Sequence, residues 1–150
     1  MQFPPLDIEK VNKLINEIKE SVERLKEFQK LSLEEFESGE DNYAIVEHHL
    51  RRSLEGIISL ATHILSRIPG GGKAKDYTES ILFLGKFGVI PRNFAEKIKG
   101  MASYRNRLVH LYWDISHKEI YQKVKNELDD FEKFCEYILK YIKSTKSSQK

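Results

Sequence analysis

Apolar residues recur at every third or fourth position through most of this chain, and no useful stretch alternates between apolar and polar positions. Spacings of three and four place side chains on one face of an α-helix. The pattern therefore predicts an all-α protein. A long first helix carries the first apolar stripe, which consists of Val11, Leu14, Ile15, Ile18, Val22, Leu25 and Phe28.

The same pattern predicts a short helical piece and a second long helix in the first half of the chain. Ser32 and Glu35 form a capping-box pair that opens the short piece, and the polar run 37–42 ends it. The second long helix is expected over about 42–68, where the segment Pro69–Gly72 stops it. Its stripe consists of Tyr43, Val46, Leu50, Leu54, Ile57, Ile58, Ala61, Leu65 and Ile68.

Three more helices are expected in the second half. Segment 77–88 reads as a short helix closed by glycine, and Pro91 suits the first turn of a helix that runs to about Leu111. Ser116 with Glu119 forms another capping box, which opens the last helix. The last stripe consists of Ile120, Val124, Leu128, Phe131, Phe134, Ile138 and Ile142.

With 150 residues, the chain has the length of one domain that can bury its own core. We expect a single domain over residues 1–150, built as an up-and-down bundle of four main helices plus one short helix. The polar, basic tail from about 143 to 150 is expected to be disordered.

Charge and composition exclude several classes of protein. The net charge is only +2, so any contact with a nucleic acid has to come from a local basic patch. Cys135 is the sole cysteine and lies on an apolar stripe, which favours a buried side chain over a nucleophile. No apolar run approaches the roughly 20 residues of a membrane span, and no secretory signal opens the chain. We expect a cytoplasmic protein without a membrane partner.

A lysine follows the glycines at 70–72, which raises the possibility of a phosphate-binding loop. That motif requires a preceding strand, a glycine where Arg67 stands, and Ser or Thr where Ala74 stands. These requirements fail, so the glycines are interpreted as a flexible connection. No set of His, Asp and Glu residues has metal-ligand spacing, and we expect no metal and no cofactor.

The octapeptide 105–112, RNRLVHLY, concentrates reactive side chains near the end of a predicted helix. Arginine binds phosphate through a planar, permanently charged fork, and histidine transfers protons near neutral pH. Cleavage of a phosphodiester without a metal needs a base, an acid and positive charge at the phosphorus. Arg105 is therefore the candidate for holding phosphate, and His110 is the candidate for acid–base catalysis.

Helical geometry complicates this assignment, because Arg105 and His110 lie about 140° apart on a straight helix. Either the helix loosens before His110, or both residues face a cleft shared with a second copy. Asn106 lies four residues before His110 and is expected to fix its tautomer. Arg105 and Tyr112, seven residues apart, are expected to share a face.

The motif and its context resemble the HEPN ribonucleases, and the ending His-x-Tyr is similar to that of the HepT branch of toxins. The resemblance extends from Tyr43 to about Tyr141, through the helix YAIVEHHLRRSLEGIISLATHILSRI, the glycine–lysine loop, SILFLGKFGVIP and the motif helix. It implies a HEPN-like helical fold and a symmetric homodimer in which the two motif helices meet.

The resemblance also implies a function. The protein would be the toxin of a type VII-like toxin–antitoxin pair, a metal-independent endoribonuclease that leaves 2′,3′-cyclic phosphate and 5′-hydroxyl ends on RNA. Arg105 and His110 would be catalytic, and Asn106 and Arg107 would support them. A cognate MntA-like nucleotidyltransferase antitoxin would inactivate it by attaching AMP to Tyr112.

Two other functions are considered. A non-catalytic HEPN-like subunit that only binds a nucleotidyltransferase is one, although such relatives commonly lack the arginine or the histidine. A helical interaction domain with a coincidental motif is the other. Single residues are left open as well: Glu55 as an arginine partner or a polar-edge charge, and Tyr104 and Trp113 as base-stacking or core residues.

Overall fold

The computed structural model describes residues 5–148, and within them it is helical with no strand, as the apolar pattern predicts. The α-helices of this part of the chain are α1 Ile8–Lys26, α2 Leu33–Ser38, α3 Asn42–Leu65, α4 Tyr77–Lys86, α5 Arg92–Ile98, α6 Gly100–His110 and α7 His117–Ser148. Its short 3-10 segments are η1 Glu27–Lys30, η2 Gly71–Lys73 and η3 Tyr112–Asp114.

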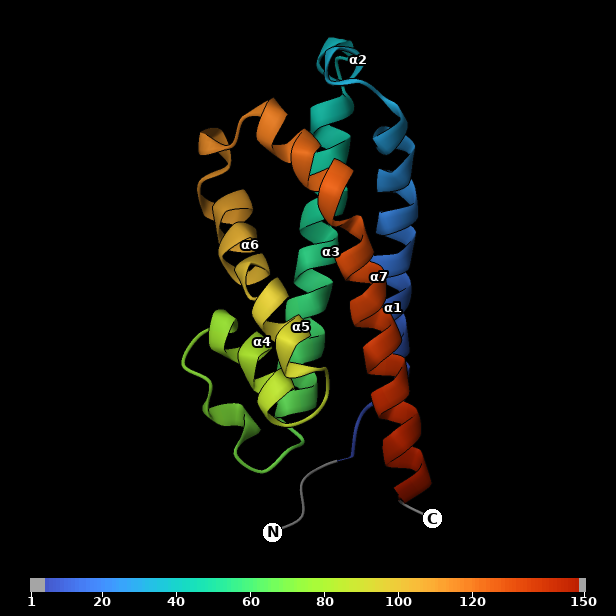
Figure 1. The fold of residues 1–150 in the computed structure, drawn as a ribbon, viewed down its shortest axis with the longest axis vertical. Coiled ribbons are helices and arrows are strands. Elements are labelled where there is room, and N and C mark those ends of the chain that lie inside the picture. The colour runs from blue at the N-terminus through green and yellow to red at the C-terminus, as the bar shows by residue number, and fades with distance from the viewer. Residues whose placement is uncertain (1–4, 149–150) are drawn as a thin grey trace.

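Three long helices, α1, α3 and α7, run side by side along the molecule, and α6 lies against α3 on the side away from α1 (Figure 1). Their directions alternate, so the predicted up-and-down arrangement is confirmed. Helix α4 packs on the last part of α3 and carries α5, whereas α2 closes the opposite end of the bundle. The end of α6 and the start of α7 therefore lie at the same end as α2.

Side-chain caps fix where several of these helices begin. Asp7 accepts a hydrogen bond from the backbone N–H of Lys10 at 3.0 Å, and Asp76 caps α4 in the same way. The predicted capping box between Ser32 and Glu35 is present in both directions. Each cap satisfies a backbone N–H that the helix itself leaves unpaired.

The structure corrects one predicted helix. The segment expected to form a single helix from Pro91 to Leu111 is two helices, α5 and α6, separated at Lys99. Pro91 is not in the first turn but is the N-cap residue before α5, with extended backbone. Ile98 and Ala102, on either side of the break, are both buried. The apolar stripe therefore runs through the break without revealing it.

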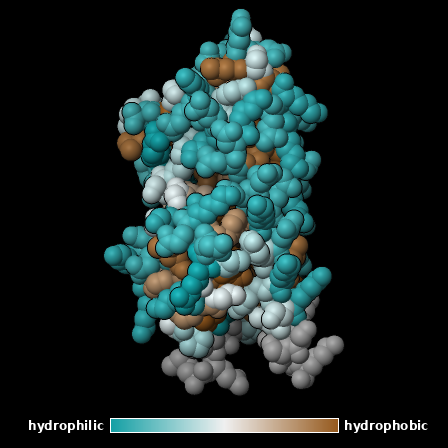
Figure 2. All heavy atoms as spheres, viewed as in Figure 1, coloured by the Kyte–Doolittle hydropathy of each residue, from teal (hydrophilic) through white to brown (hydrophobic). Residues whose placement is uncertain are grey.

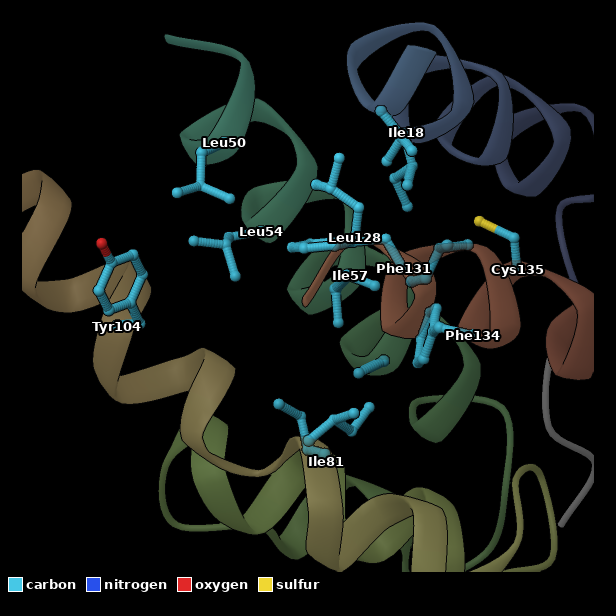
Figure 3. Close-up of a cluster of buried hydrophobic side chains, with 14 of the residues drawn as sticks. Ile18, Leu50, Leu54, Ile57, Ile81, Tyr104, Leu128, Phe131, Phe134 and Cys135 are labelled. Carbon is cyan, nitrogen blue, oxygen red and sulfur yellow. The ribbon is translucent and has the colours of Figure 1, made fainter. Parts of the chain in front are cut away.

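The core lies between α1, α3 and α7, with the inner faces of α4 to α6 closing it (Figure 3). Nearly all the predicted stripe residues are buried, including the whole α7 stripe. Cys135 is fully buried, as expected, and burial raises the pKa of its thiol to about 11. Gly56 lies where α1 and α3 cross, and a Cβ there would stand 2.6 Å from Cγ1 of Ile18.

The C-terminal end differs from the prediction of a disordered tail. Helix α7 continues through Ser148, so residues 143–148 are helical in the structure. Residues 149–150 lie outside the described residues. Polar side chains cover most of the face seen in Figure 2, with apolar patches over α4 and α5. No helix in the described part is long and apolar enough to cross a bilayer.

Candidate active site at the end of α6

Helix α6 stays helical up to His110 and ends there. The N–H of Leu111 closes the last turn on the carbonyl of Arg107 at 2.8 Å, and the backbone of Leu111 then leaves the helical region. The helix does not loosen before His110, so Arg105 and His110 keep their separation of about 140°. Tyr112 lies beyond the helix in η3, so the expectation that it shares a helical face with Arg105 is wrong.

Arg105 is placed where α3, α4 and α6 converge. Its Nη2 lies 3.8 Å from Oε1 of Glu55 on α3, and its guanidinium lies over the ring of Tyr77 on α4, 5.8 Å from the centroid. The side chain is only 22% exposed. Its Nε–H is buried and has no acceptor among the described residues, so part of the donor set is unused.

Glu55 thus proves to be an arginine partner, although its own carboxylate is partly exposed. Asn106 also contacts Arg105, because its amide oxygen accepts a hydrogen bond from Nη1 at 3.1 Å. Within the described residues no hydrogen bond joins Asn106 to His110. Asn106 therefore orients the guanidinium in this structure instead of the imidazole.

Arg107 is occupied by a second set of contacts. Its Nη1 and Nη2 donate to the carboxylate of Glu119 at 2.8 and 3.1 Å, and Glu119 raises the pKa of the guanidinium. Glu119 receives the Ser116 cap through its N–H, but its carboxylate binds Arg107 instead of completing a capping box. Arg107 therefore fixes the turn between α6 and α7. Its guanidinium is already paired with Glu119, so it is less free to contact an RNA backbone in the supporting role expected from the sequence.

His110 and the residues after it are exposed. Leu111, Tyr112 and Trp113 expose 44%, 58% and 70% of their surface. The Tyr112 and Trp113 rings meet edge to face, with centroids 5.3 Å apart. This turn is the most exposed apolar segment of the described chain, and the Tyr112 ring is open to solvent.

A shallow pocket joins Tyr112 to α3. Arg51 and Glu47 line it, together with Tyr43, Leu108 and Val109. Arg51 Nε pairs with Glu47 at 3.2 Å. Arg51 cannot be singled out from the sequence, because only the fold brings α3 beside the turn after α6.

Tyr104 and Trp113 have opposite environments. Tyr104 is 6% exposed, and burial raises the pKa of its phenol strongly. Lys123 lies over its ring, 4.6 Å from the centroid. Tyr104 is therefore the core residue of the two, and Trp113 lies at the surface.

Two of the other histidines make structural contacts. His63 is buried, its Nε2 accepts the N–H of Asp7 at 3.1 Å, and burial lowers the pKa of its imidazole. His49 hydrogen-bonds to Ser21, whereas His48 is exposed. No group of three or more His, Cys, Asp or Glu side chains in the described chain is arranged to hold a metal.

Fold and site together define a small helical bundle that presents an arginine and a histidine, five residues apart, followed by an exposed tyrosine. The family model described as "HepT-like: Ribonuclease HepT-like" matches residues 18–138. The chain belongs to the HepT-like ribonuclease family, as the motif led us to expect.

Individual relatives agree with this membership. The chain is 29% identical over 123 residues to a protein named tRNA nuclease HepT from Aphanizomenon flos-aquae, covering 81% of this chain and 82% of the relative. It is 29% identical over 90 residues to mRNA nuclease HepT from Shewanella oneidensis, covering 60% and 67%. A solved structure described as tri-AMPylated Shewanella oneidensis HEPN toxin in complex with MNT antitoxin superposes with a TM-score of 0.74, at 25% identity over 86% of this chain and 96% of that chain.

Proposed function

We propose that this protein is the toxin of a type VII-like toxin–antitoxin pair and cleaves RNA without a metal ion. The observation that carries the proposal is the state of the two motif residues. The guanidinium of Arg105 is held by a long, 3.8 Å pairing to Glu55, and His110 is exposed at the end of α6. Relatives named as nucleases of tRNA and mRNA support the substrate class.

The reaction uses the nucleophile that RNA itself carries. The ribose 2′-hydroxyl attacks the adjacent phosphorus while a base removes its proton, and the 5′ oxygen leaves with a proton from an acid. Neutral imidazole serves as the base and imidazolium as the acid, so His110 supplies this chemistry. The products are a 2′,3′-cyclic phosphate and a 5′-hydroxyl.

Arg105 stabilises the charge that develops on the phosphoryl oxygens. The Tyr77 ring and the carboxylate of Glu55 hold its guanidinium in place before RNA arrives. A guanidinium that is already oriented loses less conformational entropy when it binds a phosphate. Glu55 acts here as a positioning residue, and a phosphate competes with its weak 3.8 Å pairing.

Within one protomer, Arg105 and His110 point in directions about 140° apart. A two-fold dimer that brings the two α6 ends together places Arg105 of each copy near His110 of the other. The exposed turn 111–113 provides apolar surface for such an interface. The composite cleft is therefore part of the proposal.

Inhibition would act through Tyr112. A nucleotidyltransferase antitoxin would transfer AMP from ATP to the phenol oxygen, forming a phosphodiester bond and releasing pyrophosphate. The added phosphate places negative charge beside the pocket that Arg51 lines and obstructs the approach of RNA to His110. The exposure of Tyr112 is the observation that favours this position.

The decisive test is cleavage of a panel of RNAs by the unmodified protein in EDTA, with chemical mapping of both new ends. We expect cyclic phosphate and 5′-hydroxyl ends from the wild type and none from Arg105→Ala or His110→Ala. Both variants should keep the helical circular-dichroism spectrum, because neither side chain belongs to the core. The assignment would be refuted if cleavage required added metal, or if both variants cleaved RNA as fast as the wild type.

A further inference from the structure

Charge is distributed unevenly over the fold. Residues 66–110 contain nine Lys and Arg and three Asp and Glu, a formal net charge of +6. Residues 1–65 contain eight basic and 13 acidic residues, a net charge of −5. Residues 66–110 form the layer of α4, α5 and α6, and residues 1–65 form α1 to α3 (Figure 1). The modest net charge of the whole chain therefore conceals a basic side and an acidic side.

Several cations of the basic layer have no carboxylate within 4.0 Å in the described part of the chain. They are Arg67, Lys73, Lys86 and Arg92. All four lie around the end of α3, the end of α4 and the start of α5, which is the end of the bundle opposite the motif turn. Arg67 donates hydrogen bonds to the carbonyls of Pro5 and His63, and Lys86 lies over the rings of Phe83 and Phe87, but no carboxylate among the described residues neutralises the charge of these four cations.

A groove runs between the start of α5 and the last part of α7 at that end. Arg92 contributes one cation from α5, and Lys140 contributes another from α7. Tyr137 and Tyr141 add aromatic surface, and no carboxylate lines the groove. Gly88 leaves open space beside it, since an added Cβ would meet no atom within 4 Å.

We propose that this groove, defined by Arg92, Tyr137, Lys140 and Tyr141, binds the RNA strand away from the cleavage site. The inference rests on the proposed ribonuclease function. Cations neutralise the phosphates and release counterions, while tyrosine rings contact sugars and bases without demanding a sequence. An acidic protein partner would also favour cations, but the two partly exposed tyrosine rings beside them favour a nucleic acid.

The groove is too far from the motif to contact the same nucleotide. Arg92 and His110 are separated by α5 and α6, which span about 25 Å at the α-helical rise. A short oligonucleotide bound at His110 does not reach the groove, whereas a long or folded RNA does. The groove therefore increases the affinity for long or folded RNAs, leaves the affinity for short fragments unchanged, and contributes nothing to the chemical step.

The test compares two variants with the same change of charge. Arg92→Glu/Lys140→Glu reverses the groove, and Lys13→Glu/Lys19→Glu reverses two exposed lysines on α1, on the acidic side. Each pair is made in the wild type for kinetics and in His110→Ala for binding without cleavage. Substrates are a full-length tRNA and a trinucleotide-sized fragment that spans its cleavage site.

For the groove variant we expect the KM and Kd for tRNA to rise about tenfold, a weaker salt dependence of binding, and unchanged kcat. Cleavage of the fragment should not change, and the α1 variant should behave as wild type on both substrates. Retained fragment cleavage would show that the catalytic site is intact even if the groove prediction fails. Arg92→Gln/Lys140→Gln repeats the test if the reversed protein does not fold.

Three results would overturn the proposal. The groove variant could bind tRNA as tightly as wild type, or the two variants could weaken tRNA binding equally, which would indicate only the overall charge. The groove variant could also keep tRNA affinity while losing self-association or antitoxin binding. In that case the groove would be a protein interface.

Discussion

Arg105 and Arg107 are separated by one residue, yet their environments differ completely. Arg107 is bound in bidentate fashion by Glu119, whereas Arg105 is held by a longer pairing to Glu55 and by an aromatic face. A bidentate pair leaves little of the guanidinium for a ligand. The sequence alone identified Arg105 and His110 by type and spacing, but only the fold shows which arginine is available.

At the residue scale the sharpest prediction concerns Tyr112. Protein co-expressed with its nucleotidyltransferase should be heavier by one or more AMP groups on Tyr112 and should not cleave RNA, because the added phosphate blocks His110. Tyr112→Phe lacks the attachment oxygen and should stay unmodified and active, with some loss allowed if the phenol assists catalysis. Intact-mass and peptide analysis measure the modification.

Tyr121→Phe is the matched control, because its hydroxyl is engaged with the carbonyl of Leu31 at 2.6 Å. This variant should be modified and silenced like the wild type. AMP found only on another tyrosine, or activity suppressed with no AMP at all, would refute Tyr112 as the inhibitory position.

At the scale of helices, the contact between α1 and α3 depends on the absence of a side chain at Gly56. A methyl group there would overlap the buried Ile18 side chain. Gly100, at the start of α6, has open space around its Cβ position and a backbone without positive φ. The two glycines therefore form an internal comparison for the same substitution.

Gly56→Ala should lower the free energy of unfolding by about 1–2 kcal/mol, since overpacking exceeds the gain in helix propensity. Gly100→Ala should raise it by up to about 1 kcal/mol, because it only restricts the unfolded chain. Urea denaturation followed by circular dichroism measures both. A stabilising Gly56→Ala would mean that the α1–α3 contact relaxes without cost.

The helices also show how far an apolar pattern can predict this fold. The stripes located the long helices and their buried faces, because burial and helical period act together over many residues. The break at Lys99 was missed, since Ile98 and Ala102 are buried on both sides of it. The position of Tyr112 was also wrong, because the turn at Leu111 depends on contacts with α7 that the local sequence does not contain.

At the scale of the whole molecule, the proposed site is built from two chains. Arg105→Ala and His110→Ala are each expected to be inactive, but their mixture should regain part of the wild-type activity. In the mixed dimer, intact Arg105 from one chain faces intact His110 from the other. The measurement is RNA cleavage after the two variants are mixed, unfolded and refolded together, beside each variant treated alone.

Sedimentation of the wild type should show a dimer at micromolar concentration. If the mixture stays as inactive as its components while mixed dimers are present, each site lies within one chain. An active monomer would also argue against the composite cleft, because one chain alone would then contain a complete site. Both results would leave the helical bundle unchanged, since the core of each protomer is complete.

The exposed indole of Trp113 also gives the molecule a built-in optical property. Trp113 is the only tryptophan in the chain, so light absorbed at the red edge of the aromatic band is emitted from this position alone. The core contains no tryptophan and contributes nothing to this emission. The emission should be that of a solvated indole, readily quenched by acrylamide. The emission of Trp113 or its quenching should change whenever the turn is covered, whether by RNA, by a second copy or by a nucleotide on Tyr112. Each of these events can therefore be followed in the unlabelled protein.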